Sequence, residues 1–241
     1  MTELAFADSW YWFLIAAVVS YLIGCINFAV IISSRKNSDI RRFGSGNPGT
    51  MNMTRTFGLK VGVINFFFDI VKGGLPTLIG WIIFKDYVFA GTNIVVADFV
   101  RCLIGFCVIA GHVFPVTLKF HGGKGIASTM GFYAFSLACD EWWYFLIVVV
   151  FLFAVLGYIA LTEWGSMGSL IGVAGLTIWQ AIVFILKYDG ELLNGYVISM
   201  FMTLLGINLF TWIRHNINIY KLLAGEEHHT AVIKHKNKSK G

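Results

Sequence analysis

Long apolar runs alternate with short polar segments along the chain. Seven runs stand out, at residues 10–33, 60–84, 91–110, 125–138, 142–162, 167–186 and 196–213. Most of them approach or exceed the ~20 residues that a helix needs to cross a bilayer. The fourth has only about fourteen residues, and a run this short must be sheltered by protein or must thin the bilayer. The pattern predicts an all-α integral membrane protein with seven transmembrane helices.

Composition agrees with a membrane location. Of the 241 residues, 57% are hydrophobic and only 13% are charged, whereas a soluble domain carries about 25% charged residues. This balance excludes an ordinary soluble domain and indicates an integral membrane protein.

The distribution of Lys and Arg predicts the orientation. Seven spans place the termini on opposite sides, and the side richer in Lys and Arg is cytoplasmic. With the C-terminus inside, fourteen of the 18 Lys and Arg residues are cytoplasmic and the outer loops hold only Lys85 and Lys187. We therefore expect the N-terminus out, a polytopic membrane domain at 1–225 and a basic cytoplasmic tail at 226–241. The polar segments 41–55, 111–124 and 214–227 then share the cytoplasmic face.

The first polar segment reads R-R-F-G-S-G-N-P-G-T-M-N-M-T-R. Its glycines free the backbone and its proline fixes a turn, so that N–H groups can curl around an anion. Neutral hydrogen-bonding groups and arginines complete a pattern suited to phosphate. The residues concerned are Gly44, Gly46, Gly49, Pro48, Ser45, Asn47, Asn52, Arg41, Arg42 and Arg55.

The second polar segment ends in Gly-Gly-Lys-Gly at 122–125, directly before an apolar helix. A helix N-terminus offers unpaired N–H donors and a positive dipole end, and both suit an anion. The segment is not a nucleotide P-loop, because Leu118 and Gly125 stand where that pattern needs Gly and Ser or Thr. A flexible basic turn is the alternative.

Further candidates lie on predicted helices. His215, Asn218 and Lys221 are spaced to share one helix face, where the histidine can transfer protons or simply lie at the interface. Asp69 and Lys72 are three residues apart, which indicates a functional pair, an internal ion pair or a snorkelling lysine. Ser166 begins a span among small residues, where its hydroxyl can bind an anion or the segment can serve helix packing.

These motifs together resemble the bacterial acyl-phosphate:glycerol-3-phosphate acyltransferases, the PlsY family. The resemblance rests on S-G-N-P-G-x-x-N-x-x-R at 45–55, F-D-x-x-K-G at 68–73, G-H-x-x-P and G-G-K-G at 111–125, and H-x-x-N-I with a following G-x-E at 215–227. His121, Ser128 and Lys221 depart from residues common in the family.

The resemblance implies acyl transfer from acyl phosphate to glycerol 3-phosphate, giving lysophosphatidic acid and inorganic phosphate, the first acylation of phospholipid synthesis. It implies a monomeric, multi-pass enzyme of the bacterial inner membrane, with a cytoplasmic active site, membrane lipids around it and no cofactor, metal or nucleic-acid partner. Together with the residue pattern it nominates catalytic and binding groups. The catalytic candidates are His215, Lys124 and Arg55; the binding candidates are Ser45, Gly46, Asn47, Gly49, Asn52, His112, Gly122, Gly123, Gly125, Ser166 and Asn218; further candidates are Asp69, Lys72, Lys221 and Glu227.

The groups present favour direct attack on the donor. Acyl phosphate is a mixed anhydride with a good leaving group, so positioning and charge stabilisation suffice and no acyl-enzyme is needed. The base is either His215 or a substrate phosphate. No histidine has an aspartate five positions later, which disfavours the His-x-x-x-x-Asp chemistry of thioester-dependent acyltransferases. The alternative function is an organophosphate or phosphate transporter, for which internal repeats and binding groups near the membrane midplane are expected.

Overall fold

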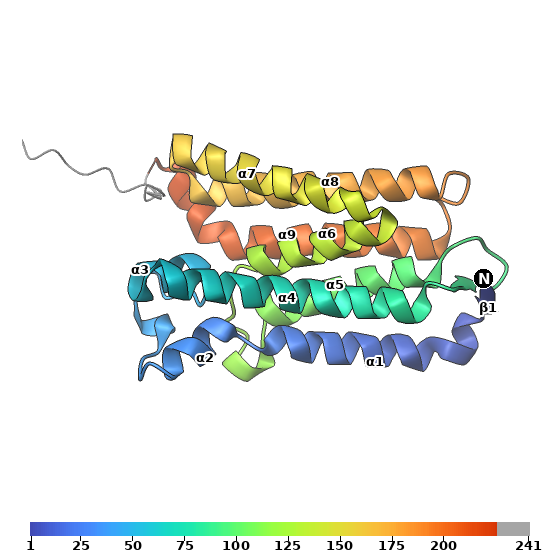
Figure 1. The fold of residues 1–241 in the computed structure, drawn as a ribbon, viewed down its shortest axis with the longest axis horizontal. Coiled ribbons are helices and arrows are strands. Elements are labelled where there is room, and N and C mark those ends of the chain that lie inside the picture. Colours follow the sequence, from blue (N-terminus) through green and yellow to red (C-terminus); the bar gives the residue numbers. More distant parts are fainter. Residues whose placement is uncertain (226–241) are drawn as a thin grey trace, which may run out of the picture.

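The computed structural model describes residues 1–225 and shows a bundle of long helices with axes running along one direction (Figure 1). The chain order is β1 Thr2–Leu4, α1 Phe6–Cys25, α2 Phe28–Ser34, a 3₁₀ turn Ile40–Arg42, α3 Thr50–Phe57, α4 Leu59–Phe84, β2 Tyr87–Phe89, α5 Val96–Val113, a 3₁₀ turn Val116–Leu118, α6 Ile126–Asp140, a 3₁₀ turn Trp142–Tyr144, α7 Phe145–Thr162, α8 Gly165–Lys187 and α9 Gly195–Leu223.

Within residues 1–225, six helical segments are long and apolar enough to cross a membrane: Phe6–Ser34, Leu59–Phe84, Val96–Leu118, Trp142–Thr162, Gly165–Lys187 and Gly195–Leu223. They match six of the seven predicted spans, so the prediction of an all-helical integral membrane protein is confirmed in its main feature. The remaining predicted span is α6, whose 15 residues extend for about 22 Å. That is less than the ~30 Å thickness of the hydrocarbon core.

Glycines let this short helix pack directly against its neighbour α4. A Cβ atom added at Gly73 of α4 would lie 2.0 Å from the Ser128 carbonyl oxygen, and one added at Gly131 of α6 would lie 2.0 Å from the Ile70 carbonyl oxygen. The two backbones are therefore in contact, and most side chains in the middle of α6 are buried. Close approach through small residues is the usual way in which helices associate in lipid.

Three predicted boundaries differ from the structure. The first span is broken between α1 and α2, where Asn27 caps α2 by accepting a hydrogen bond from Val30 N–H at 3.0 Å. The polar segment 34–58 is not all loop, because α3 occupies Thr50–Phe57. The last helix continues to Leu223, ten residues beyond the predicted end at 213, so it carries His215 and Asn218 on one rigid element.

The helical bundle also carries one short two-stranded sheet that the sequence did not predict. Strand β1 pairs in parallel with β2, with Thr2 opposite Tyr87 and Leu4 opposite Phe89. The strands lie at the end of the bundle where α1 begins (Figure 1). Three-residue strands carry no periodic signal in sequence, and this pairing joins segments that are far apart in the chain.

A buried charge network holds the same end of the bundle. Arg101 of α5 is fully buried and forms ion pairs with Asp98 at 3.0 Å and Asp140 at 2.6 Å. Lys187 at the end of α8 lies 2.7 Å from Asp98. Two cations and two carboxylates thus balance each other and connect α5, α6 and α8, which agrees with a structural interpretation of Asp98 and Arg101.

Candidate active site

The first polar loop is built around Asn52, which is 1% exposed. Its amide nitrogen donates to the Phe43 carbonyl at 2.9 Å and its oxygen accepts from Ser45 N–H at 3.3 Å. Gly44 has φ +56, and a Cβ atom there would lie 2.2 Å from the Asn52 oxygen. The predicted binding residue Asn52 therefore holds the shape of the loop with both ends of its amide.

The outer rim of this loop carries the groups that remain available to a ligand. Ser45 is exposed, and Gly46, Asn47 and Gly49 are half-buried. Ser45 Oγ accepts a hydrogen bond from Asn47 N–H at 3.4 Å. Arg55 projects from α3 as an exposed residue, and it has no ion-pair partner within residues 1–225. The first loop and α3 thus offer a hydroxyl, an amide and a guanidinium group that are exposed or half-buried.

Arg41 differs from Arg55 because its charge is already paired. Its guanidinium donates to both carboxylate oxygens of Asp39, with NH2 at 2.9 Å from Oδ2 and Nε at 3.0 Å from Oδ1. These hydrogen bonds hold the pKa of Asp39 below its ordinary value. Of the two arginines, Arg55 is the better candidate for an anionic ligand.

The Gly-Gly-Lys-Gly loop is fixed over the end of α5 and α9. The N–H groups of Gly122 and Gly123 donate to the carbonyls of Val113 and His112 at 3.2 and 3.1 Å. Their own carbonyls accept from the Arg214 guanidinium at 2.5 and 3.2 Å. The backbone N–H and carbonyl groups of both glycines are thus hydrogen-bonded to other protein groups. Gly123 also packs closely on His112, because an added Cβ atom would lie 2.3 Å from His112 Nε2.

The start of α6 presents donors that the helix itself does not use. Gly125, with φ +82, precedes the helix, and the first helical hydrogen bond runs from Thr129 N–H to the Gly125 carbonyl at 2.8 Å. The N–H groups of residues 126–128 therefore have no partner within the helix. The Ser128 and Thr129 hydroxyls are buried and have no hydrogen-bond partner among residues 1–225. This arrangement suits an anion next to Lys124.

Helix α9 places its polar side chains beside this loop. Lys124 Nζ donates to Asn218 Oδ1 at 2.8 Å. One turn earlier, buried His215 bonds through Nδ1 to the Thr211 carbonyl at 2.8 Å. A carbonyl only accepts, so Nδ1 carries the proton and the neutral ring has its lone pair on Nε2. Lys221, on the same helix, is exposed.

The other predicted residues lie deeper or elsewhere. Ser166 is buried in the first turn of α8. Asp69 and Lys72 form a buried ion pair at 2.8 Å on α4, and His112 lies against it, 3.7 Å from Asp69. Glu227 and the predicted tail 226–241 lie outside the described residues. Among the described residues, no group of three or more His, Cys, Asp and Glu side chains is placed to hold a metal ion.

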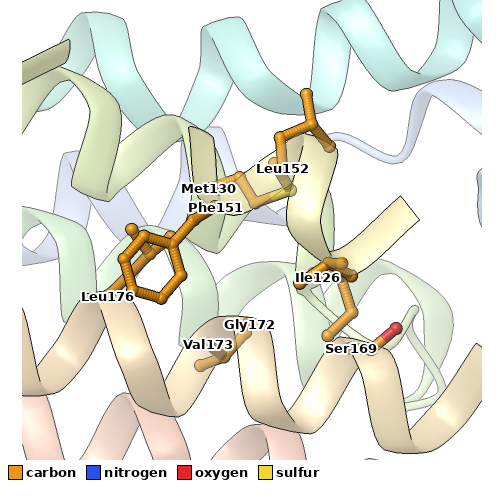
Figure 2. A pocket seen from close by; sticks show the side chains of 9 residues that line it. Ile126, Met130, Phe151, Leu152, Ser169, Gly172, Val173 and Leu176 are labelled. Atoms are coloured by element: carbon orange, nitrogen blue, oxygen red, sulfur yellow. The ribbon is translucent and has the colours of Figure 1, made fainter. Parts of the chain in front are cut away.

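An apolar cleft opens between α6, α7 and α8 (Figure 2). It begins near the Gly-Gly-Lys-Gly loop with Ile126 and near Ser166 with Ser169, and it ends at Phe151 and Leu176. Its volume is about 40 Å³, which is too small to enclose a fatty acyl chain. Gly172 and Gly175 let α7 lie close to α8, with added Cβ atoms only 2.8 Å from Val155 and 2.3 Å from Phe151.

Sequence reasoning missed several residues that hold the site. The sequence indicates for Arg214 only a positive charge near the end of the last span. In the structure its guanidinium donates hydrogen bonds to the carbonyls of Gly122 and Gly123. Asn65 and Asn27 went unnoticed because single asparagines in or next to apolar runs have no distinctive spacing. A polar residue inside a predicted span was the available signal, and it applied both to Asn27 in the first predicted span and to Asn65 in the second.

The family model for glycerol-3-phosphate acyltransferase matches residues 14–225. The glycerol-3-phosphate acyltransferase of Thermoanaerobacter sp. (strain X514) is 33% identical over 223 residues, covering 88% of this chain and 93% of that protein. Glycerol-3-phosphate acyltransferase 3 of Dehalococcoides mccartyi (strain ATCC BAA-2266 / KCTC 15142 / 195) is 35% identical over 217 residues, covering 89% and 94%.

A solved structure has the same fold. The crystal structure of PlsY (YgiH), an integral membrane glycerol 3-phosphate acyltransferase, in its glycerol 3-phosphate form matches with a TM-score of 0.70 at 27% identity, covering 90% of this chain and 94% of that one. Its lysophosphatidic acid form matches with a TM-score of 0.69. The chain therefore belongs to the PlsY family of glycerol-3-phosphate acyltransferases.

Proposed function

We propose that this acyltransferase moves a fatty acyl group from acyl phosphate directly to a hydroxyl of glycerol 3-phosphate, without an acyl-enzyme. The observation that carries the proposal is the pairing of Lys124 with Asn218 at 2.8 Å. It links Lys124, two residues before the unused N–H groups of α6, to a side chain that lies one helical turn after His215. A site for a phosphate thus lies beside a group that can orient a hydroxyl.

The donor phosphate would bind at the start of α6. Lys124 supplies a point charge there, and the N–H groups of residues 126–128 supply oriented donors. Both interactions stabilise the transition state more strongly than the bound substrate, because negative charge develops on the departing phosphate. The acyl chain would enter the cleft between α6, α7 and α8 (Figure 2) and continue into the surrounding lipid, because the cleft holds only a small part of it.

The acceptor phosphate would bind at the first loop. Arg55 can grip two phosphate oxygens in a bidentate manner, with Ser45 and Asn47 completing the contacts. The glycerol hydroxyl would then lie near Nε2 of His215, which has its lone pair available. We assign the proton transfer to the donor phosphate, with His215 and Asn218 orienting the hydroxyl.

The same proposal fixes the topology. Helix α6 is a seventh, protein-sheltered crossing, which puts the start of α1 and the end of α9 on opposite sides. The positive-inside rule then places the C-terminus and both loops in the cytoplasm. Helix α3 and the end of α9 lie at the same end of the bundle (Figure 1), which is compatible with one active site on that face. We propose a monomer in the bacterial inner membrane that uses no cofactor.

The test uses purified protein, labelled glycerol 3-phosphate, and palmitoyl phosphate or palmitoyl-CoA in parallel. We expect lysophosphatidic acid from palmitoyl phosphate alone, loss of product in Lys124→Ala, and normal activity in the control Lys119→Ala, which removes an exposed lysine of the same segment. Product from the thioester alone would overturn the proposed donor.

A further inference from the structure

The ion pair between Asp69 and Lys72 lies inside α4, beneath the candidate site. The Oδ1–Nζ distance is 2.8 Å, and each side chain is only 4% exposed. Burying two charges in a membrane protein is costly unless every polar atom finds a partner. The hydrogen-bond partners of Asp69 and Lys72 therefore show which segments of the protein this ion pair connects.

Lys72 connects to the first loop through the broken first span. Its Nζ donates to the Ile26 carbonyl at 2.9 Å, at the point where α1 has ended and α2 has not begun. The break leaves this carbonyl without a helical partner, and inside a membrane such a group must be satisfied by protein. The next residue, Asn27, donates to the Pro48 carbonyl at 3.4 Å, in the centre of the first loop.

Asp69 connects to the same loop by a second route. Its Oδ2 accepts a hydrogen bond from Asn65 Nδ2 at 3.1 Å, and Asn65 Nδ2 also lies 3.3 Å from Thr50 Oγ1. Thr50 is the first residue of α3, the helix that carries Arg55. The Asn65 amide thus links Asp69 to the start of α3, which also packs on α4 through Thr54 and Gly62.

On its other side the pair reaches the second loop through His112. The imidazole Nδ1 lies 3.7 Å from Asp69 Oδ1, a packing contact longer than a hydrogen bond, and it has no hydrogen-bond partner among residues 1–225. The opposite nitrogen, Nε2, lies where only a glycine fits, since a Cβ atom on Gly123 would be 2.3 Å away. Gly123 immediately precedes Lys124, so the His112 ring packs directly against the Gly-Gly-Lys-Gly loop.

We propose that Asp69, Lys72 and His112 form a positioning centre that sets the spacing between the two phosphate-binding loops and binds no substrate itself. The inference rests on the proposed function, in which the two loops hold the two substrates. Every contact described above joins the centre to a protein group, and the pair connects to the first loop on one side and to the second loop on the other. A misplacement of about 1 Å between reacting groups can cost ~10²-fold in rate, so such a centre acts mainly on kcat.

The test compares Asp69→Asn, Lys72→Met and the double variant with the wild type. The double variant removes both charges together, so it avoids leaving one buried charge unpaired. We expect kcat to fall by ~10- to 100-fold in all three. The KM values for glycerol 3-phosphate and for palmitoyl phosphate should stay within about threefold, because each loop keeps its own ligands.

Asp98→Asn is the matched control, because Asp98 also pairs with a cation three residues later but lies at the opposite end of the bundle. It should lower the thermal midpoint and leave kcat per folded molecule unchanged. If the Asp69 and Lys72 variants behave in the same way, the centre is merely structural and the proposal is wrong. A selective rise of tenfold or more in one KM would identify a substrate ligand and would also overturn it.

Wild-type turnover of palmitoyl phosphate, measured alongside, separates this inference from the proposed function. No turnover by folded wild type would refute the donor assignment. Wild-type turnover with unchanged kcat in the double variant would refute the positioning centre alone.

Discussion

Lys124 and Asn218 are 94 residues apart in sequence, yet Lys124 Nζ donates to Asn218 Oδ1 at 2.8 Å. The contact joins the loop before α6 to the last third of α9. Arg214, four residues before Asn218, binds the two glycine carbonyls that precede Lys124. The loop and the helix therefore form one rigid unit, in which a cation, an amide and the histidine of α9 have fixed relative positions.

Replacing Lys124 should impair turnover more than replacing Asn218. We expect Lys124→Met to lose ~10²- to 10³-fold in kcat, the cost typical of removing one group that stabilises developing charge. Asn218→Ala should lose less, because the lysine charge remains. Since the two side chains touch, the effects in the double variant should be less than additive. Additive effects in steady-state assays of all three variants would show that the pair does not act together.

Arg41 and Arg55 of the first segment should differ in importance. Arg55→Gln should lower kcat/KM for glycerol 3-phosphate by ~10- to 100-fold, which corresponds to about 1.5–3 kcal/mol for a lost charge-assisted hydrogen bond. Arg41→Gln should change it by less than about threefold, because the Arg41 guanidinium is already bonded to Asp39. Initial rates at varied glycerol 3-phosphate measure both. Equal losses in the two variants would argue against the assignment of Arg55.

The fit of Gly123 against His112 predicts a steric effect with a rescue. Gly123→Ala places a Cβ atom 2.3 Å from His112 Nε2, and overpacking of this kind costs about 1–3 kcal/mol. We expect at least a tenfold lower kcat, because the Gly-Gly-Lys-Gly loop would be displaced. The double variant Gly123→Ala, His112→Ala should recover part of the lost kcat, because removing the imidazole leaves space for the added Cβ atom. Gly157→Ala is the control, since a Cβ atom there meets nothing within 4 Å, and it should be silent.

His215→Gln distinguishes the two candidate bases. Glutamine can still hydrogen-bond the glycerol hydroxyl, so kcat should remain within about tenfold of wild type if the donor phosphate accepts the proton. Removing a true general base costs ~10²- to 10⁴-fold. Single-turnover rates with saturating substrates give the comparison, and a loss in that higher range would assign the base role to His215.

Hydropathy and spacing were sufficient to predict the long helices, because a span of apolar residues has few alternatives in a bilayer. They did not predict the break at Ile26–Asn27, which depends on Lys72 donating to a carbonyl 46 residues away. They also did not predict α3, because this helix has only eight residues, follows a glycine-rich loop and is too polar to stand out by hydropathy. Local patterns carry no information about such distant partners.

The candidate site shows the same division. The motifs nominated candidate residues for phosphate binding, because Gly, Lys, Arg and Asn in short polar segments suit anions. They could not separate residues that face a ligand from residues that hold the loops. Asn52 and Gly122 share a motif with Ser45 and Lys124, respectively, but their polar groups are used within the protein. Only the three-dimensional contacts distinguish the two roles.

The most direct test of the central claim follows the acyl group itself. Purified enzyme is mixed with palmitoyl phosphate labelled in the acyl chain, first without and then with glycerol 3-phosphate, and is quenched on the millisecond scale. Direct transfer predicts no label on the protein in either case, with lysophosphatidic acid and inorganic phosphate formed together only when the acceptor is present. Stoichiometric labelling of the protein before the acceptor is added, with a matching burst of phosphate, would contradict the account.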